Sequence, residues 1–160
     1  MTTWPDVMLT ARATHMDELI RRYFDGCNEA DVGKITTCFT PEAVHYFPPG
    51  MYNGPFRGAA AIASRWQEMV KTIGSYWTVD TLLIEPVTWK AVMEWTHFKT
   101  VKKTMLRGIE VYEFDHHTGL ISEIRAYYAS PQAAEVSRQE LEAFDYAARG
   151  YPMAPPVGAR

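Results

Sequence analysis

The sequence predicts an α+β fold in which three helices pack on one face of a strongly curved antiparallel sheet. Apolar residues in the first half of the 160-residue chain repeat mainly with the period of a helix, whereas residues 75–129 form long β-rich segments. The links between these segments are only a few residues long, which suits antiparallel neighbours because parallel strands need a dozen residues or more. We expect a conical space between helices and sheet, and we expect the function to lie there.

Length and composition indicate a single domain over residues 1–160. The chain is 47% hydrophobic, which is ordinary for a globular protein and unlike a disordered one. We expect a core at about residues 14–129, followed by a C-terminal helix and a proline-rich extended arm over residues 130–160. No apolar run approaches the roughly 20 residues that cross a bilayer, and no secretory signal is visible, so we expect no membrane partner.

Charge and motif content exclude several classes of partner. The net charge is −3 and no basic cluster exists beyond Lys102-Lys103, which argues against nucleic acid. Cys27 and Cys38 are too few for a disulfide framework, so we expect a cytoplasmic protein. The metal-site spacings H-x-x-x-H and C-x-x-C do not occur, and no glycine-rich loop offers a run of N–H groups to phosphate. We therefore expect neither a metal nor a cofactor.

Three helices are predicted in the first half of the chain. The first begins near Thr14, where apolar residues form one helical stripe. Asp31 can cap a short second helix, which we expect Pro41 to end. The third runs from Ala59 to about Ile73, and Gly74 stops it.

The strands follow a different pattern. A brief extended piece over Ala43–Phe47 precedes Asn53-Gly54, which is the strongest short hairpin-turn dipeptide. Alternation and β-branched residues then predict four long strands, at residues 75–84, 89–100, 105–114 and 120–129. A last helix is expected over about Gln132–Ala148, and the proline-containing tail Gly150–Arg160 is expected to be an extended arm.

Several local motifs resemble the nuclear-transport-factor-2-like superfamily. The motifs are Arg22-Tyr23 followed by Glu29-Ala30-Asp31, Phe39-Thr-Pro-Glu-Ala-Val, Ile109-Glu-Val-Tyr-Glu-Phe-Asp, Gly119-Leu-Ile and Arg125-Ala-Tyr-Tyr. Together with the element order, the resemblance covers about residues 14–129. It implies a cone-shaped roll and points to the enzymatic branch of the superfamily, which includes SnoaL-like cyclases, ketosteroid isomerases and limonene-epoxide hydrolases. The fold hosts many activities, so it does not choose among them.

The resemblance also implies roles for individual positions. The isomerases' first-helix tyrosine, a donor to the developing oxyanion, falls on Tyr23, and their second oxyanion partner falls on Glu110. The tryptophan that ends their last strand falls on Tyr128. Their general base falls on Phe47, and a phenyl ring cannot take a proton. The water-activating residues of the epoxide hydrolases are replaced by His45 and Phe47 on the first strand and by an alanine on the last.

Strand alternation places further candidates on the inner face of the sheet. Glu110 is the sharpest signal, because an unpaired acid in a central strand would cost several kcal/mol if buried; the alternatives are exposure to water or pairing with Arg125. His45 and His97 are each the only imidazole of their strand, which suits proton transfer, although each could instead be a core histidine bonded to a carbonyl. The candidate substrate contacts are Phe47, Trp66, Trp95, Tyr128, Tyr112 and Arg57.

These residues predict a cofactor-independent acid/base enzyme. We expect a lyase that performs elimination, dehydration or retro-aldol deformylation on a bulky hydrophobic, aromatic or polycyclic small molecule. In this reading His45 or His97 is the base, Glu110 is the coupled acid or orienter, and Tyr23 donates to oxygen. The alternatives are an isomerase or cyclase with a relocated base, and a binding module without catalysis. We also expect a homodimer or higher homo-oligomer formed through the outer face of the sheet.

Overall fold

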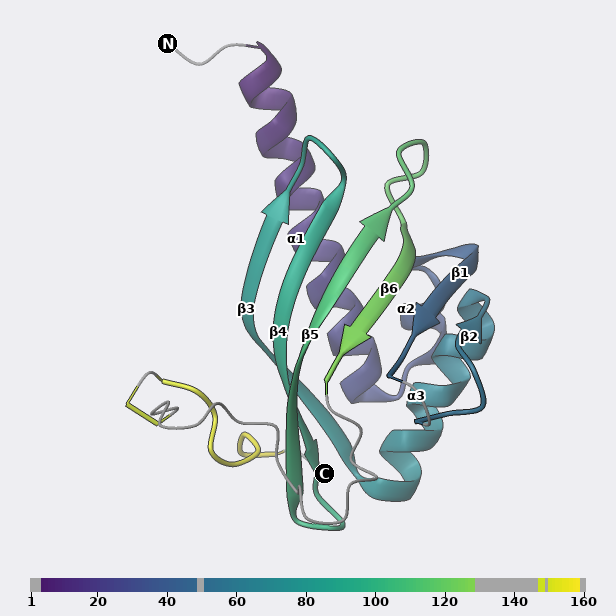
Figure 1. Ribbon diagram of the computed structural model, residues 1–160, viewed down its shortest axis with the longest axis vertical. Coiled ribbons are helices and arrows are strands. Elements are labelled where there is room, and N and C mark those ends of the chain that lie inside the picture. Colours follow the sequence, from purple (N-terminus) through teal and green to yellow (C-terminus); the bar gives the residue numbers. More distant parts are fainter. Residues whose placement is uncertain (1–3, 49–50, 129–146, 149, 159–160) are drawn as a thin grey trace.

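The computed structural model describes residues 4–48, 51–128, 147–148 and 150–158 (Figure 1). It is an α+β fold, as predicted. The elements are α1 (Trp4–Glu29), α2 (Val32–Thr36), β1 (Phe39–Tyr46), β2 (Phe56–Arg57), α3 (Ala59–Ile73), β3 (Ser75–Glu85), β4 (Lys90–Lys99), β5 (Thr104–Phe114) and β6 (Ile121–Tyr127).

The six strands form one curved sheet in the order β2-β1-β6-β5-β4-β3. The strands from β3 to β6 pair antiparallel with their chain neighbours, which confirms the prediction from their short links. The pair β1–β6 is parallel, and α3 and four strands separate its members along the chain. The helices lie on one face of the sheet and leave it unclosed (Figure 1), so the inner face of the sheet and the helices enclose the core.

Helix α1 begins at Trp4 rather than near Thr14. Its first turns are largely exposed, with Val7 and Met8 at 50% and 62%, so no buried stripe marks them in the sequence. Arg12 fixes this part of the helix to the sheet. Its Nη1 donates to the carbonyl of Pro86 over 2.8 Å, and its guanidinium lies 4.4 Å from the ring centre of Trp89.

The second helix is capped as predicted but does not end at Pro41. The Asp31 carboxylate accepts a hydrogen bond from the Lys34 N–H over 2.9 Å, and the helix stops at Thr36. Pro41 lies inside β1, where the expected strand was shorter. The pairing of β1 with β6 shifts register between Phe39 and Val44, so the missing N–H of the proline interrupts no regular ladder.

The third helix and the four long strands agree with the prediction to within about two residues at each end. Helix α3 covers Ala59–Ile73, and Gly74 follows it in the left-handed conformation with φ of 64°. A side chain at Gly74 would also collide with Thr100, since its Cβ would lie 2.0 Å from the hydroxyl oxygen.

The predicted C-terminal helix over residues 132–148 lies outside the described residues, apart from 147 and 148. Described residues 147, 148 and 150–158 contain turns but no helix or strand. Tyr151 and Pro152 lie on the outer face of the sheet. The Tyr151 hydroxyl donates to Glu94 on β4 over 2.6 Å, and Arg107 on β5 donates to the Pro152 carbonyl over 2.8 Å. Arg107 is only 4% exposed although it points away from the core.

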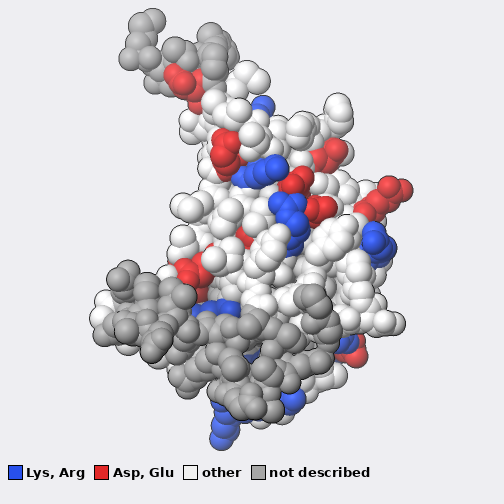
Figure 2. All heavy atoms as spheres, viewed as in Figure 1, with Lys and Arg blue, Asp and Glu red and all other residues white. Residues whose placement is uncertain are grey.

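The outer face of the sheet carries charges of both signs among uncharged side chains (Figure 2). Glu113 contacts both Lys90 and Arg125, at 3.4 and 2.8 Å. Beside these charges, Ile109 and its cross-strand partner Tyr127 are 46% and 59% exposed. None of the described helices is both long and apolar enough to cross a membrane.

Candidate active site

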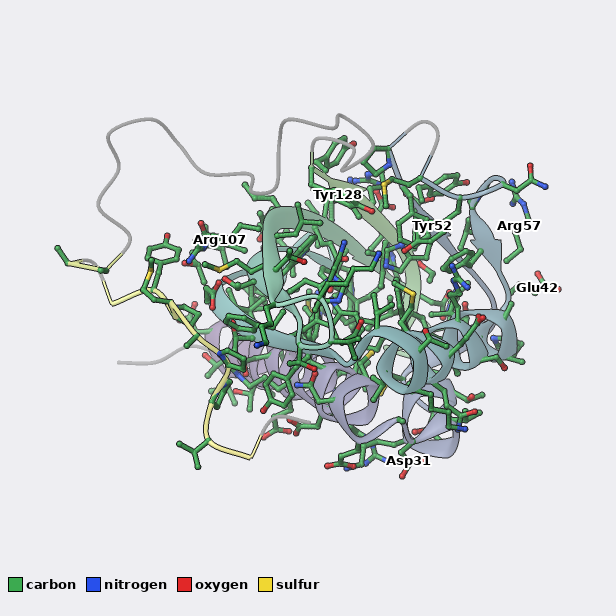
Figure 3. All side chains as sticks on the ribbon, turned by 90° about the horizontal axis from the view of Figure 1, so that it is seen from below. Asp31, Glu42, Tyr52, Arg57, Arg107 and Tyr128 are labelled. Carbon is green, nitrogen blue, oxygen red and sulfur yellow. The ribbon has the colours of Figure 1, made fainter. Side chains whose placement is uncertain are left out.

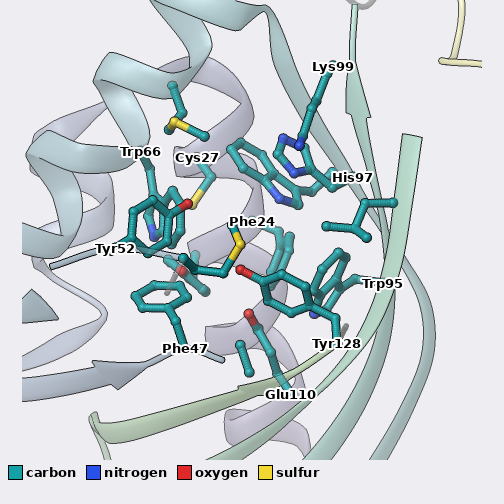
Figure 4. Close-up of a pocket in the computed structure, with 16 residues that line it drawn as sticks. Phe24, Cys27, Phe47, Tyr52, Trp66, Trp95, His97, Lys99, Glu110 and Tyr128 are labelled. Atoms are coloured by element: carbon teal, nitrogen blue, oxygen red, sulfur yellow. The ribbon is translucent and has the colours of Figure 1, made fainter. Parts of the chain in front are cut away.

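A cavity lies between the helices and the inner face of the sheet (Figure 4). Its volume is about 60 Å³. Rings form most of its wall, and its polar groups come from α1, β4, β5 and the end of β6. The aromatic wall consists of Phe24, Phe47, Tyr52, Trp66, Trp77 and Trp95, and the polar groups are Tyr23, His97, Lys99, Glu110 and Tyr128.

Strand alternation brings Glu110 into this cavity. On β5 its neighbour Ile109 is 46% exposed on the outer face, whereas Glu110 is 6% exposed on the inner face. Its cross-strand partners are Met93 on β4 and Ala126 on β6, and both are buried and apolar. A carboxylate placed among such neighbours needs polar partners from within the fold.

Two buried side chains supply those partners. The Tyr112 hydroxyl donates a short hydrogen bond to Oε2 of Glu110, and Nε2 of His45 lies 3.5 Å from Oε1, at ion-pair distance. Tyr112 and His45 are completely buried and do not line the cavity. Glu110 therefore stands between them and the cavity. The expected alternative partner, Arg125, binds Glu113 and Glu123 on the outer face instead.

Both ring nitrogens of His45 face acceptors. Its Nδ1 lies 3.3 Å from the Tyr46 carbonyl oxygen, and its Nε2 faces Glu110. A neutral imidazole carries one N–H and satisfies only one of these contacts, unless Glu110 itself carries a proton. Satisfying both acceptors would therefore take one proton more than a neutral imidazole and a carboxylate carry. The Phe47 ring is stacked on His45 at 4.2 Å and lines the cavity, whereas His45 does not.

The second predicted imidazole has a different environment. His97 lines the cavity, stacks on Trp77 at 4.4 Å and has its Nε2 2.8 Å from the Ser75 hydroxyl. Burial, aided by the nearby charge of Lys99, lowers the pKa of His97 to about 3. His97 is therefore neutral at any ordinary working pH and is a poor base.

Two tyrosines provide neutral donors close to the carboxylate. Burial raises the pKa of Tyr23 well above its usual range, and nearby Cys27 and Glu110 raise it further. Burial likewise raises the pKa of Tyr128, with contributions from Tyr52 and Glu110. Both phenols keep their protons and can donate hydrogen bonds to an oxygen of a ligand. Figure 4 shows the Tyr128 hydroxyl and the Glu110 carboxylate pointing into the same part of the cavity.

Gly108 allows the wall of the cavity to form. It pairs directly with Trp95 across β4 and β5, and the indole lies against its Cα. A Cβ at this position would be 2.5 Å from Cζ2 of Trp95. Only a glycine lets the Trp95 ring lie this close to the β5 backbone.

Comparison with protein families identifies the chain. A SnoaL-like domain matches residues 20–124, which is more than half of the sequence. The chain belongs to the SnoaL-like family.

Solved structures similar to this SnoaL-like domain share its fold. A protein of unknown function with a cystatin-like fold from Methylobium petroleophilum PM1 is 59% identical, with a TM-score of 0.73, over 90% of this chain and 95% of that one. An NTF2-like protein of unknown function from Mesorhizobium loti is 18% identical, with a TM-score of 0.61, over 73% of this chain and 93% of that one.

An NTF2-like protein of unknown function from Cytophaga hutchinsonii is 11% identical, with a TM-score of 0.58, over 71% of this chain and 88% of that one. These two NTF2-like structures confirm the predicted superfamily fold. No curated protein matches the sequence.

Within this SnoaL-like domain, most of the predicted site residues come together. Those that line the cavity are Tyr23, Phe47, Trp66, Trp95, His97, Glu110 and Tyr128. His45 and Tyr112 lie behind Glu110, as a second layer. Arg57 does not line the cavity: it is exposed on the edge strand β2 and points away from the molecule (Figure 3).

The cavity residues that were not among the predicted site residues of the SnoaL-like domain include Trp77, Lys99 and Tyr52. Trp77 follows Ser75 by two positions on β3, so alternation could have placed it on the inner face. Lys99 follows His97 on the inner row of β4 in the same way. Tyr52 lies in the segment between β1 and β2, where no periodicity exists, and it packs on Phe47 at 4.6 Å. Among the described residues, no three His, Cys, Asp or Glu side chains cluster to hold a metal.

Proposed function

We propose that the protein is a cofactor-independent acid/base enzyme that acts on a hydrophobic, ring-bearing small molecule. One observation supports this most directly: a carboxylate, Glu110, faces an aromatic cavity and is backed by a buried imidazole and a buried phenol. Such a buried polar cluster in an apolar pocket is typical of sites that transfer protons.

Glu110 is the proton-transfer group in this proposal. It is the one acid among the described cavity residues, whereas His45 has no contact with the cavity and His97 is a poor base. The role of base thus moves from the histidines to Glu110. His45 and Tyr112 are positioning residues, because they orient the carboxylate and share its proton.

A lyase reaction requires few other groups. The Glu110 carboxylate removes a proton from a C–H or O–H of the substrate, and the electron pair moves to break a C–O or C–C bond. In an elimination, the same carboxyl group can return the proton to the departing oxygen if both lie on one face of the substrate. The hydroxyls of Tyr23 and Tyr128 stabilise the developing negative charge on oxygen.

An isomerase or cyclase is the second candidate, and the same geometry favours it. Glu110 can move a proton between two carbons while the tyrosines hold an enolate oxygen. Phe47 occupies the position of the usual isomerase base, so Glu110 would be the relocated base. The third candidate, a binding module without catalysis, leaves the buried His45–Glu110 pair without a role.

The cavity must widen to hold a ring. Its 60 Å³ is less than half of the roughly 150 Å³ apolar cavity that binds benzene. Met51 and Tyr52 line it from the segment between β1 and β2, and neither residue belongs to a strand. We propose that these two side chains move when the substrate enters.

Mass spectrometry of a substrate panel tests the proposal. The panel contains aromatic diols, hydroxyketones and enones, and products are compared for wild type, Glu110→Gln and Glu113→Gln. Glu113 lies on the same strand but on the outer face, so it is a matched control. We expect E110Q to lose turnover by about 100-fold or more, and E113Q to keep it.

The products separate the candidates. Loss of formaldehyde or water supports the lyase, and an unchanged mass with a shifted ultraviolet spectrum supports the isomerase. If E110Q turns over as fast as wild type, Glu110 is not the proton-transfer group. If ligands bind with no chemical change in any variant, the protein is a binding module.

A further inference from the structure

Lys99 places a positive charge at the opposite end of the cavity from Glu110. In the register of β4 and β5, Glu110 pairs with Met93, and Lys99 follows Met93 by six residues. Six residues of strand correspond to about 20 Å along the backbone. Figure 4 shows Lys99 beside His97, away from Glu110, and both residues line the cavity. The cavity therefore has an ammonium group at one end and a carboxyl group at the other, with aromatic rings between them.

Lys99 has no acidic partner in the described part of the chain. The ion pairs among the described residues do not include Lys99, and the nearby charge that acts on Lys99 is that of another lysine, Lys102. Burial, together with Lys102, lowers the pKa of Lys99. A half-buried ammonium that faces an aromatic cavity without a counter-ion is costly, and an anionic ligand group would remove that cost.

We propose that the substrate of this site carries a carboxylate, which binds Lys99. This inference rests on the proposed function and deepens it by naming the substrate class: a ring-bearing carboxylic acid. The carboxylate pairs with the ammonium, the ring lies between Trp77 and Trp95, and the reacting carbon points toward Glu110.

A carboxylate fits better than a phosphate. Lys99 is the one cation among the described cavity residues, and one ammonium balances one negative charge. Phosphate sites generally add arginines or a run of backbone N–H groups, and neither lines this cavity. The charge of Glu110 disfavours the reverse orientation, because it would place two carboxylates together. Lys99 is therefore a specificity-determining residue that orients the substrate.

The test compares a carboxylate with its neutral isostere. Benzoate and benzamide are titrated into wild type, Lys99→Gln, Lys99→Arg and Lys103→Gln, and the indole N–H signals of the cavity tryptophans are followed by NMR. Lys103 lies in the turn after β4 and is exposed, so it is the matched control. We expect wild type and K103Q to bind benzoate about tenfold more tightly than benzamide. K99Q should lose this preference through weaker benzoate binding alone, and K99R should keep part of it.

Three results overturn the inference: equal affinity of wild type for the two compounds, a preference that survives in K99Q, or no response of the indoles to benzoate at saturating concentration. The same titration with E110Q separates this inference from the proposed function. E110Q should keep the benzoate preference, since Glu110 lies at the other end. Turnover that persists in E110Q refutes the proposed function without affecting the role of Lys99.

Discussion

The environment of His97 makes the stability of the protein sensitive to acid. Burial and Lys99 lower the pKa of this imidazole from 6.5 to about 3, so the folded protein keeps it neutral. In the unfolded chain the same ring takes up a proton near pH 6.5. Between those two values the unfolded chain binds more protons at this residue, so the free energy of unfolding falls as the pH falls through that window.

The size of the effect follows from the two pKa values. At pH 5 the unfolded ring is almost fully protonated and the folded ring is almost fully neutral. Because pH 5 lies about 1.5 units below the unfolded pKa of 6.5, the free energy of unfolding is about 2 kcal/mol lower at pH 5 than at pH 8. Further acid increases the loss, until the pH approaches about 3 and the folded ring titrates as well.

The contribution of His97 to this pH dependence is measured by urea denaturation of wild type and His97→Gln at pH 8 and pH 5, followed by tryptophan fluorescence. Carboxyl groups titrate in both proteins, so the difference between the two pH dependences isolates His97. We expect H97Q to lose about 2 kcal/mol less than wild type between the two pH values. His117→Gln removes an exposed histidine and is the control. Equal pH dependences in wild type and H97Q, or an NMR titration of His97 near pH 6.5, would refute the reasoning.

Three other changes test the packing, the site and the assembly. Tyr112→Phe removes the donor to the site carboxylate and should lower the free energy of unfolding by about 1.5–3 kcal/mol, measured in urea, and reduce turnover; unchanged values would contradict the hydrogen bond. Gly108→Ala places a methyl group against Trp95 and should cost about 1–3 kcal/mol with an altered fluorescence spectrum, whereas a neutral effect would show that the indole can move. We propose a homodimer through the outer face of the sheet, so Tyr127→Asp, beside exposed Ile109, should shift a dimer to a monomer in light scattering. A monomeric wild type would exclude that interface.

The parts of the fold that follow from local patterns could be predicted from the sequence. Helix α3 and its end at Gly74 agree with the prediction, because a buried stripe and a left-handed glycine are both encoded locally. The start of α1 could not be found by the same means. Its first turns face solvent, and Arg12 holds them to the sheet through contacts with Pro86 and Trp89, which are distant in the sequence.

The sequence predicts which face of the sheet each site residue lies on, but not whether its side chain reaches the cavity. Alternation placed Glu110 and His45 on the inner face, but it cannot say which of two inward side chains touches the cavity. That depends on Phe47, which stacks on His45 and covers it. Tyr52 belongs to a segment without periodicity, so only the folded structure brings it to the wall.

His45 and His97 occupy equivalent positions on their strands, but their neighbouring side chains differ in charge. Both belong to inward-facing rows of their strands, and both stack on an aromatic ring. A proton on His45 would be paired with Glu110, which lies 3.5 Å away, whereas a proton on His97 would face Lys99 and have only the Ser75 hydroxyl as a polar partner. Burial is the largest cause of the lowered pKa of His97, and the charge of Lys99 adds to it, whereas the charged neighbour of His45 is a carboxylate. This difference supports the proposal that places acid/base chemistry at the Glu110 end of the cavity and the charge of the ligand at the Lys99 end.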